Sequence, residues 1–185
     1  MLFRSLQLLG DNMPNGCLFQ MVFDTITSQL NFTYMSKSWE DITNISADAV
    51  IADLNVYLKH IYPEDLFFLN QKIEHIAEHE LLENFSLELR FVLDNGEMRW
   101  LKMATTPHLE GTDVIWDGFF VDVTEYKHAE QLVRSEKERI EALGNNLPGG
   151  ALFRYRTKYH EAGQSMAFEY VSATWEKITD WKSVV

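Results

Sequence analysis

The clearest hydrophobic pattern in the chain runs from Phe85 to Phe91, where apolar residues occupy every second position. Alternation of this kind is typical of a strand with one buried face. Asn95-Gly96 follows, and an Asn-Gly pair between two hydrophobic runs predicts a tight hairpin. We expect a type I′ turn there, with both residues at positive φ, and a return strand over residues 98–106.

The other hydrophobic runs place several helices between two groups of strands. Runs rich in β-prone residues predict further strands over residues 17–23, 30–35 and 114–123. Short helices are predicted over 37–43, ended by Asn44, and over 47–54, capped by Ser46. Pro63 opens a longer helix with an apolar stripe formed by Leu66, Leu69, Ile73 and Ile76. This order predicts an α+β fold: a five-stranded antiparallel sheet with its helices between strands two and three, followed by a long connecting helix.

The connecting helix is predicted directly after the last strand. We expect the Thr124 hydroxyl to cap it and Gly144 to end it. Its apolar positions repeat with 3,4 spacing and are Tyr126, Ala129, Val133, Ile140, Leu143 and Leu147, with Glu136 in the same row. Such a row is typical of a helix that pairs with another helix, so it predicts a homodimer formed through helices. The alternative is an ordinary amphipathic helix packed on its own domain.

The same sequence begins twice in this chain. Residues 9–19 and 143–153 agree at seven of eleven positions, and residues 32–43 and 168–179 agree at seven of twelve. The offset grows from 134 to 136 residues, which places two extra residues in the intervening loop. A repeat this long points to tandem globular domains. We expect residues 1–9 to end an upstream helix, 10–124 to form one domain, 125–143 to form a linker helix, and 144–185 to begin a second, incomplete domain.

Composition narrows the possible partners. Of the 185 residues, 46% are hydrophobic, which is enough for a folded core. The net charge of −12 argues against a nucleic-acid partner, because such proteins present clustered Lys and Arg. The single cysteine, Cys17, cannot form an internal disulfide, and no apolar run approaches the length of a membrane span. These features predict a cytoplasmic chain without direct membrane insertion.

Several short motifs resemble the PAS domain family. Asp122-Val123-Thr124 resembles the Asp-x-Thr that closes the last PAS strand, and residues 95–100 resemble the hairpin Asp-Gly-x-x-Arg-Trp. Tyr62-Pro63-Glu64-Asp65 resembles His-Pro-x-Asp and departs from it at Tyr62. Residues 39–44 resemble aromatic-x-x-Leu-Thr-Gly, with Asn44 in place of Gly. The resemblance covers residues 10–124 in full and residues 144–185 as a shorter second copy.

The resemblance implies a sensory or regulatory module of signal transduction. PAS domains commonly stand in tandem before histidine kinase, cyclic-dinucleotide or response-regulator outputs, joined by helices of this kind. It implies an output domain outside this chain, a histidine kinase of a two-component system. It also implies that a signal leaves the domain through Asp122, Val123 and Thr124. The alternative is that these three residues are an ordinary helix cap without special coupling.

Haem, flavin and catalytic chemistry are not expected. Some PAS domains ligate haem from the long helix, which here carries His75 and His79, but His75 lies about 200° around the helix from Ile73 and so faces solvent. A surface metal site made by this pair has no evident further ligands. Flavin-binding light sensors of the family carry a cysteine after the third element, whereas Cys17 lies on the first strand. No nucleotide-binding or hydrolase motif occurs, so we expect no catalytic residue.

The apolar interior allows two readings of different classes. In the sensor reading, a small molecule occupies a pocket between sheet and helices, lined by Trp39, Phe67, Trp100 and Trp116. In the scaffold reading, these aromatic residues fill a ligand-free core, and the domain serves dimerisation and protein–protein interaction. Both readings need the same hydrophobic interior, so the sequence leaves them open.

Overall fold

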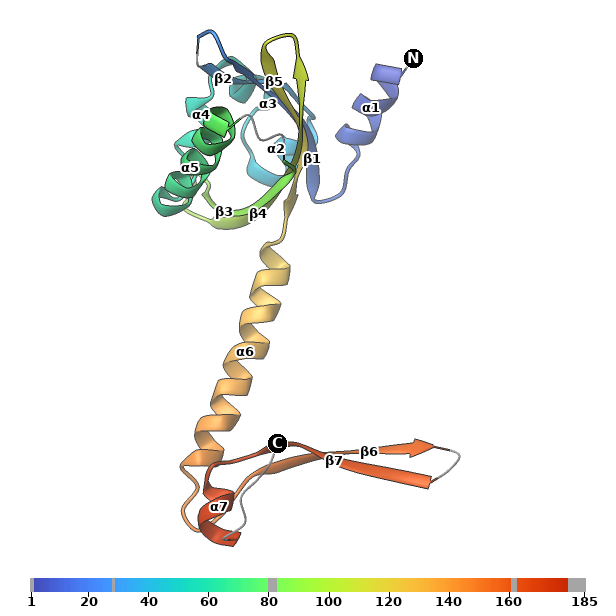
Figure 1. Cartoon of the computed structure of the whole chain (residues 1–185), viewed down its shortest axis with the longest axis vertical. Coiled ribbons are helices and arrows are strands. Elements are labelled where there is room, and N and C mark those ends of the chain that lie inside the picture. The colour runs from blue at the N-terminus through green and yellow to red at the C-terminus, as the bar shows by residue number, and fades with distance from the viewer. Residues whose placement is uncertain (1, 28, 80–82, 161–162, 180–185) are drawn as a thin grey trace. The chain divides into compact units, whose positions relative to one another are not determined.

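The computed structural model describes residues 2–27, 29–79, 83–160 and 163–179 (Figure 1). Within these ranges, the side chains of residues 2–6, 74–79, 160 and 163 lie outside the description. The chain divides into two compact units, Met1–Lys127 and His128–Val185.

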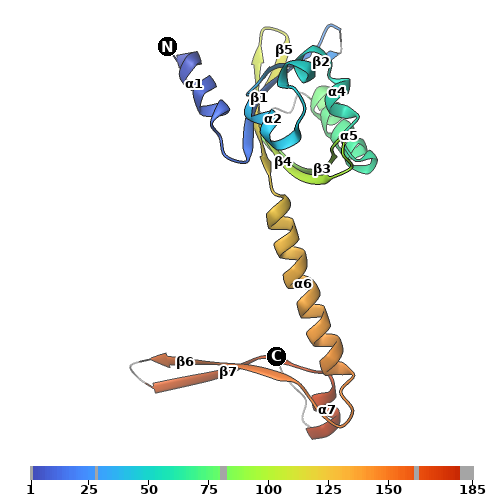
Figure 2. The ribbon, with the colours of Figure 1, turned by 180° about the vertical axis from the view of Figure 1, so that it is seen from behind.

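The first unit contains a sheet, a group of helices and the start of a long helix. Its elements are α1 (Leu2–Asp11), β1 (Gly16–Asp24), β2 (Gln29–Met35), α2 (Ser38–Thr43), α3 (Ala47–Ala52), α4 (Asn55–Leu58), α5 (Pro63–His79), β3 (Phe85–Val92), β4 (Met98–Glu110), β5 (Asp113–Asp122) and the first residues of α6 (Thr124–Asn145). The sheet order is β2-β1-β5-β4-β3, and every neighbouring pair is antiparallel. Helices α4 and α5 lie on one side of the sheet and α1 on the other (Figures 1 and 2). The predicted fold class is confirmed.

The core fills the space between the sheet and helices α2 to α5. Strand alternation turns Phe19 of β1 and Phe120 of β5 to this side, where both are buried. Trp39 of α2 lies among them, with its ring centroid 5.5 Å from Phe91 and 5.3 Å from Phe120. Full burial of one such large apolar side chain stabilises a domain by about 1.5–3 kcal/mol. The aromatic residues of three separate elements therefore hold the sheet against α2.

The hairpin between β3 and β4 differs from the predicted type I′ turn. The Gly96 N–H donates to the Leu93 carbonyl at 2.9 Å, and the Leu93 N–H donates to the Glu97 carbonyl at 2.8 Å. Gly96 has φ of +83°, but Asn95 is not among the residues with positive φ. The loop therefore has three residues, with Gly96 alone in the left-handed region. The Asn95 side chain explains the change, because its Oδ1 accepts the Glu97 N–H at 2.9 Å.

Asn44 ends α2 in the left-handed conformation, as predicted, with φ of 58°. Both ends of the helix predicted over residues 47–54 are corrected. This helix ends at Ala52 as α3, and α4 begins separately at Asn55, because the Asp53 carboxylate accepts the Asn55 N–H and starts a new turn. Ser46 takes the cap position of α3 without a side-chain cap bond, since Glu40 Oε1 accepts the Ala47 N–H instead.

The second unit contains most of α6 and a two-stranded antiparallel sheet, drawn in orange and red in Figure 1. Its further elements are β6 (Phe153–His160), β7 (Gly163–Val171) and α7 (Thr174–Thr179). Gly144 does not end α6, which continues to Asn145. A Cβ atom at Gly144 would lie 3.0 Å from the Ser172 Cβ and 3.3 Å from the Leu152 Cβ. Glycine at this position therefore permits a close approach rather than a left-handed cap.

Both units begin with the same set of contacts, which we call the entry motif. In the first unit it comprises Gly10, Leu18, Ser36 and Ser38, and in the second Gly144, Leu152, Ser172 and Thr174. The Ser36 hydroxyl accepts the Leu18 N–H at 2.9 Å, and the Ser172 hydroxyl accepts the Leu152 N–H at 3.0 Å. The Ser38 and Thr174 hydroxyls donate to the Gly10 and Gly144 carbonyls. The strand pairing shifts register after Gln20 in one unit and after Arg154 in the other.

Candidate signalling junction and interior cavity

Asp122 ends β5 and connects three segments of the first unit. Its Oδ1 accepts the Thr124 N–H at 2.9 Å, and its Oδ2 lies 3.3 Å from Arg99 Nη1. Its own N–H donates to the Asn15 carbonyl at 2.7 Å. A carboxylate at the beginning of a helix is favoured by the helix dipole, and its hydrogen bonds are charge-assisted. Asp122 therefore fixes the first residue of α6 relative to β4 and to the loop before β1.

Thr124 binds β4 rather than capping its own helix. Its Oγ1 accepts the Trp100 N–H at 2.9 Å, and the adjacent Val123 N–H donates to the Trp100 carbonyl at 2.8 Å. The expected hydroxyl cap of α6 is thus replaced by the Asp122 carboxylate. The reason is that the β4–β5 pairing ends at Leu101 and Asp122, and the Trp100 backbone just beyond it still needs an acceptor and a donor.

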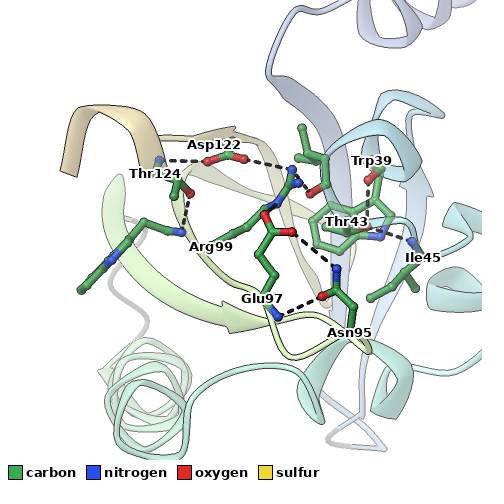
Figure 3. A network of polar contacts seen from close by, with 10 residues as sticks. Trp39, Thr43, Ile45, Asn95, Glu97, Arg99, Asp122 and Thr124 are labelled. Carbon is green, nitrogen blue, oxygen red and sulfur yellow. Dashed lines mark hydrogen bonds and ion pairs between the residues drawn. The ribbon is translucent and has the colours of Figure 1, made fainter. Parts of the chain in front are cut away.

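Arg99 extends this junction to α2. Its Nη1 donates to the Ile42 carbonyl at 2.8 Å, and its Nε lies 3.0 Å from Glu97 Oε1 (Figure 3). A guanidinium at the end of a helix satisfies a carbonyl that lacks a partner within the helix. The same side chain contacts Asp122, so α2 and the start of α6 share one cation. We use the name junction network for Ile42, Arg99, Asp122, Thr124 and the backbone of Trp100.

The first turn of α6 has a second attachment to the sheet. Lys127 Nζ lies 2.6 Å from Glu88 Oε2 and 5.4 Å from the centre of the Trp100 ring. A cation over a Trp ring is attracted by about 0.5–1 kcal/mol at exposed sites. Trp100 is next to the buried Leu101, so strand alternation places its side chain on the face opposite the core.

The Tyr62–Asp65 motif attaches α5 to β3. Asp65 Oδ1 lies 2.7 Å from Arg90 Nη2, and Asp65 Oδ2 accepts both the Arg90 Nε–H and the Arg90 backbone N–H. Hydrogen bonding by the Arg90 side chain lowers the pKa of Asp65 below its ordinary value. The guanidinium also lies 4.1 Å from the centre of the Tyr62 ring. This motif is structural: it fixes the start of the long helix.

A cavity of about 240 Å³ lies between the sheet and helices α4 and α5. Its lining is almost entirely apolar and consists of Met21, Phe23, Leu30, Leu54, Tyr57, Leu58, Leu69, Asn70, Ile73, Phe85, Met103 and Trp116. No Asp, Glu, Lys, Arg or His side chain is among these lining residues. The Tyr57 hydroxyl and the Trp116 Nε1 are buried and find no hydrogen-bond partner within the described part of the chain. Burial of the hydroxyl raises the pKa of Tyr57.

The structure separates the four aromatic residues expected to line a pocket. Trp116 lines the cavity. Trp39 is fully buried in the adjoining core, with its ring centroid 6.0 Å from that of Tyr57. Phe67 is 59% exposed on the outer side of α5, and Trp100 lies on the other face of the sheet, so neither lines the cavity. The expectation failed for these two because composition does not reveal which side of an element faces inwards.

Comparison with known proteins agrees with this architecture. Residues 32–120 match the family described as PAS fold. Residues 32–120 therefore have the PAS fold. A sensory box histidine kinase/response regulator from Burkholderia thailandensis E264 superposes with a TM-score of 0.51 at 16% identity, covering 77% of this chain and 100% of that chain. The PAS domain of a protein from Colwellia psychrerythraea superposes with a TM-score of 0.50 at 12% identity, covering 68% and 99%. At these identities the likeness concerns the fold, and no curated protein matches the chain.

Cofactor ligands are not evident in the described part of the PAS domain. The side chains of His75 and His79 lie outside the described residues. Among the described side chains, no group of three His, Cys, Asp or Glu is placed to hold a metal ion. Cys17 is fully buried on β1, and burial raises the pKa of its thiol from 9.0 to about 12. Such a thiol remains protonated at neutral pH.

The helix that leaves the PAS domain exposes its apolar row. Tyr126, Val133 and Leu143 are exposed, as are Ala129 and Ile140. Leu147 lies beyond the end of α6. No helix in the described ranges is both long and apolar enough to cross a membrane.

Sequence reasoning missed Arg99, Lys127 and Tyr57 as parts of these sites. Arg99 lies within the hairpin motif of residues 95–100. A charged residue three positions after the predicted Asn95-Gly96 turn could have indicated its role. Its contact with Ile42 joins residues 57 positions apart, which no local pattern reveals. Tyr57 carried no signal, because a tyrosine in a short helix is equally common at the surface.

Proposed function

We propose that this PAS domain is a sensory module that passes a signal through α6 to an output domain outside the chain, a histidine kinase. The junction network carries this proposal, because it connects the helical side of the domain to the first residue of α6. We assign the module itself no catalytic step. Its partners are a small ligand, the output domain and a second copy of the chain.

A chain of contacts runs from the cavity to α6. Tyr57 lines the cavity and touches Trp39, and Trp39 belongs to α2. The Ile42 carbonyl of α2 accepts from Arg99, which in turn pairs with Asp122. A ligand that displaces Tyr57 would therefore move α2 and shift the cation shared with Asp122. Such a shift needs differential binding to two states of the domain.

The cavity suits a small, uncharged and mainly apolar ligand with a hydrogen-bond acceptor. An apolar lining disfavours any unpaired charge, and buried donors without a partner gain from an acceptor. Native mass spectrometry and an absorbance spectrum of the purified chain test the sensor reading. A neutral molecule that stays bound through purification supports the sensor reading. Protein that is empty in repeated preparations and still dimerises supports the scaffold reading.

The alternative is a ligand-free scaffold for dimerisation and protein–protein interaction. The exposed apolar row of α6 favours it, because such a row gains stability by pairing with a second helix. Sedimentation of the chain and of its Val133→Asp variant tests pairing. We expect dimers that the Asp substitution disrupts, because it places a charge within the row.

The second unit is proposed to be the beginning of a second PAS domain. The shared entry motif and the shared register shift support this reading. The proposed division is residues 1–9 as the end of an upstream helix, 10–124 as the PAS domain, 125–143 as the linker helix and 144–185 as the second, incomplete domain.

Signal transfer is tested in the full-length parent with Asp122→Ala and Thr124→Ala. Asp122→Ala removes the bonds to Thr124 and Arg99, and Thr124→Ala removes the bond to Trp100. Each bond contributes about 1 kcal/mol, far below the roughly 5–15 kcal/mol that stabilises a domain. We expect altered output activity with little change in melting temperature. Ser46→Ala is unsuitable as a control, since Ser46 makes no cap bond. Asp24→Ala is better matched, because Asp24 Oδ1 accepts two backbone N–H groups in the exposed β1–β2 turn.

If Asp24→Ala changes output as much as the junction variants, the junction has no special role.

A further inference from the structure

Asparagine followed by glycine is the dipeptide most prone to spontaneous deamidation, and the chain contains it twice, at Asn15-Gly16 and at Asn95-Gly96. The reaction needs the backbone nitrogen of the next residue to reach the carbon of the side-chain amide. Glycine hinders that approach least, because it lacks Cβ and its backbone turns freely. The two pairs therefore differ only in their neighbours and in their place in the fold.

Asn95-Gly96 lies at the tip of the β3–β4 hairpin. Both residues are exposed, and a Cβ atom at Gly96 would meet nothing within 4 Å, so the backbone has room to turn. The Asn95 Oδ1 accepts the Glu97 N–H at 2.9 Å, and the Asn95 Nδ2 lies 3.5 Å from Glu97 Oε2 (Figure 3). The Gly96 N–H donates to the Leu93 carbonyl at 2.9 Å, and this bond must open before the Gly96 nitrogen attacks.

Asn15-Gly16 lies at the start of β1, where Gly16 is buried. Gly16 pairs with Val121 of β5, and a Cβ atom on Gly16 would lie 2.8 Å from the Phe120 carbonyl oxygen. The Asn15 carbonyl accepts the Asp122 N–H at 2.7 Å. Turning the Gly16 nitrogen towards the Asn15 side chain would break both the pairing and the bond to Asp122. Attack at Asn15 therefore requires the ends of β1 and β5 to separate.

We propose that Asn95 is a site of spontaneous deamidation in the folded protein and that the fold protects Asn15 from the same reaction. The Gly96 nitrogen loses its proton to solvent base and bonds to the Asn95 Cγ. The Cγ–Nδ2 bond then breaks, and the amide nitrogen takes up a proton from solvent and leaves as ammonia. Water opens the resulting cyclic imide at either carbonyl, which leaves aspartate or isoaspartate at position 95. The Glu97 N–H favours the attack, because it points at Oδ1, where negative charge develops.

Either product changes the turn beside the junction network. Glu97 Oε1 lies 3.0 Å from Arg99 Nε, and Arg99 also contacts Asp122. Aspartate at position 95 places a carboxylate beside that of Glu97, and like charges at this spacing repel. Isoaspartate adds a methylene group to the backbone of the three-residue loop and disrupts it. An effect on output rests on the proposed signalling role, whereas the reaction itself does not.

Incubation of the purified chain at pH 8 tests the proposal. The chain is digested with pepsin in acid, and mass spectrometry follows the conversion of amide to acid in the peptides that contain Asn15 and Asn95. We expect Asn95 to convert at least about tenfold faster than Asn15, because an exposed loop tip opens locally far more readily than paired strands. Conversion of Asn95 should accelerate with rising pH, since the Gly96 amide must lose its proton.

Two comparisons show whether the fold decides the difference and what the product does. In concentrated urea both pairs are free to react, and we expect their rates to approach each other. In folded chains that carry isoaspartate, hydrogen exchange of the Glu97 amide should accelerate, because Asn95 Oδ1 no longer accepts its N–H. Asn95→Asp keeps an acceptor at this position and should leave that exchange slow.

Equal rates at the two asparagines in the native chain, or faster conversion of Asn15, overturn the proposal. A tenfold difference that persists in urea also overturns it, since the neighbouring residues and not the fold would then cause it. Conversion of Asn95 in urea alone would show that the Leu93–Gly96 bond prevents the reaction, which overturns it as well. Deamidation is read from peptide mass and the junction from output activity, so either proposal can fail without the other.

Discussion

The two units share their entry motifs but differ in how far the strands that follow the motif are buried. In both, a serine hydroxyl accepts the N–H of the equivalent leucine, and a second hydroxyl donates to the carbonyl of a glycine in the last turn of the preceding helix. In both, that glycine is pressed against the same serine. Yet Phe19 is buried in one unit and Phe153 half exposed in the other.

The entry motif depends on residues that are close in the sequence, whereas burial of the aromatic residues depends on strands that are distant in it. The entry motif is built from residues within about thirty positions of one another, and both copies contain all of them. The aromatic core needs β3, β4 and β5, which follow later and are present for the first unit. A two-stranded hairpin is marginally stable in water, and more strands or a packed helix are needed for independent stability.

The largest expected effect is a difference in stability loss between the two units when their equivalent tryptophans, Trp39 and Trp175, are replaced. Trp39→Ala removes a fully buried ring and should lower the free energy of unfolding of the first unit by about 3–5 kcal/mol. Trp175→Ala at the equivalent, partly exposed position should cost less than about 1 kcal/mol. Urea denaturation combined with limited proteolysis measures both, with residues 151–179 cut before residues 17–124. Equal losses for the two variants would contradict the account.

A second effect concerns Cys17, which the second unit replaces with Ala151. Burial holds the folded-state pKa of the thiol at about 12, above the ordinary 9.0. The neutral thiol is thus favoured on folding, so its contribution to stability is complete below pH 9 and is lost as pH rises towards 12. We expect a thiol reagent at pH 8 to label unfolded protein and spare native protein.

The matched variant is Cys17→Ala, which should flatten the alkaline decline in stability between pH 9 and 12. Rapid labelling of native protein at pH 8 would contradict the burial of this thiol.

The sequence predicted the fold class, the sheet and the point where β5 gives way to α6, because each depends on short-range patterns. Alternation from Phe85 to Phe91 and the Asp122–Thr124 motif are signals of this kind. It misplaced Phe67 and Trp100, since the side of an element that faces inwards is decided by packing partners elsewhere in the chain. The type I′ turn failed for a related reason: the Asn95 side chain offered the Glu97 N–H a competing acceptor. The cavity depends on β1, α4, α5 and β4 meeting in space, which no single stretch encodes.

A smaller effect tests whether the two entry motifs are equivalent. Ser36→Ala and Ser172→Ala each leave one strand N–H without its hydroxyl acceptor, at Leu18 and Leu152. Each should cost about 0.5–1.5 kcal/mol locally, which is the usual net contribution of one hydrogen bond. Hydrogen exchange of the Leu18 and Leu152 amides should accelerate by similar factors in the two variants. A large change in one and none in the other would show that the motifs are not equivalent.

The smallest change in stability is expected at the junction network, through which the signal is proposed to pass to α6. Spin labels at the exposed positions Glu110 and Gln131 report the orientation of α6 relative to the PAS domain through the width of their distance distribution. Asp122→Ala removes the bonds to Thr124 and Arg99 and should broaden this distribution, with little loss of melting temperature. Asp24→Ala should leave the width unchanged, although it also removes two hydrogen bonds. Equal widths for the two variants would contradict the claim that the junction network holds α6 in place.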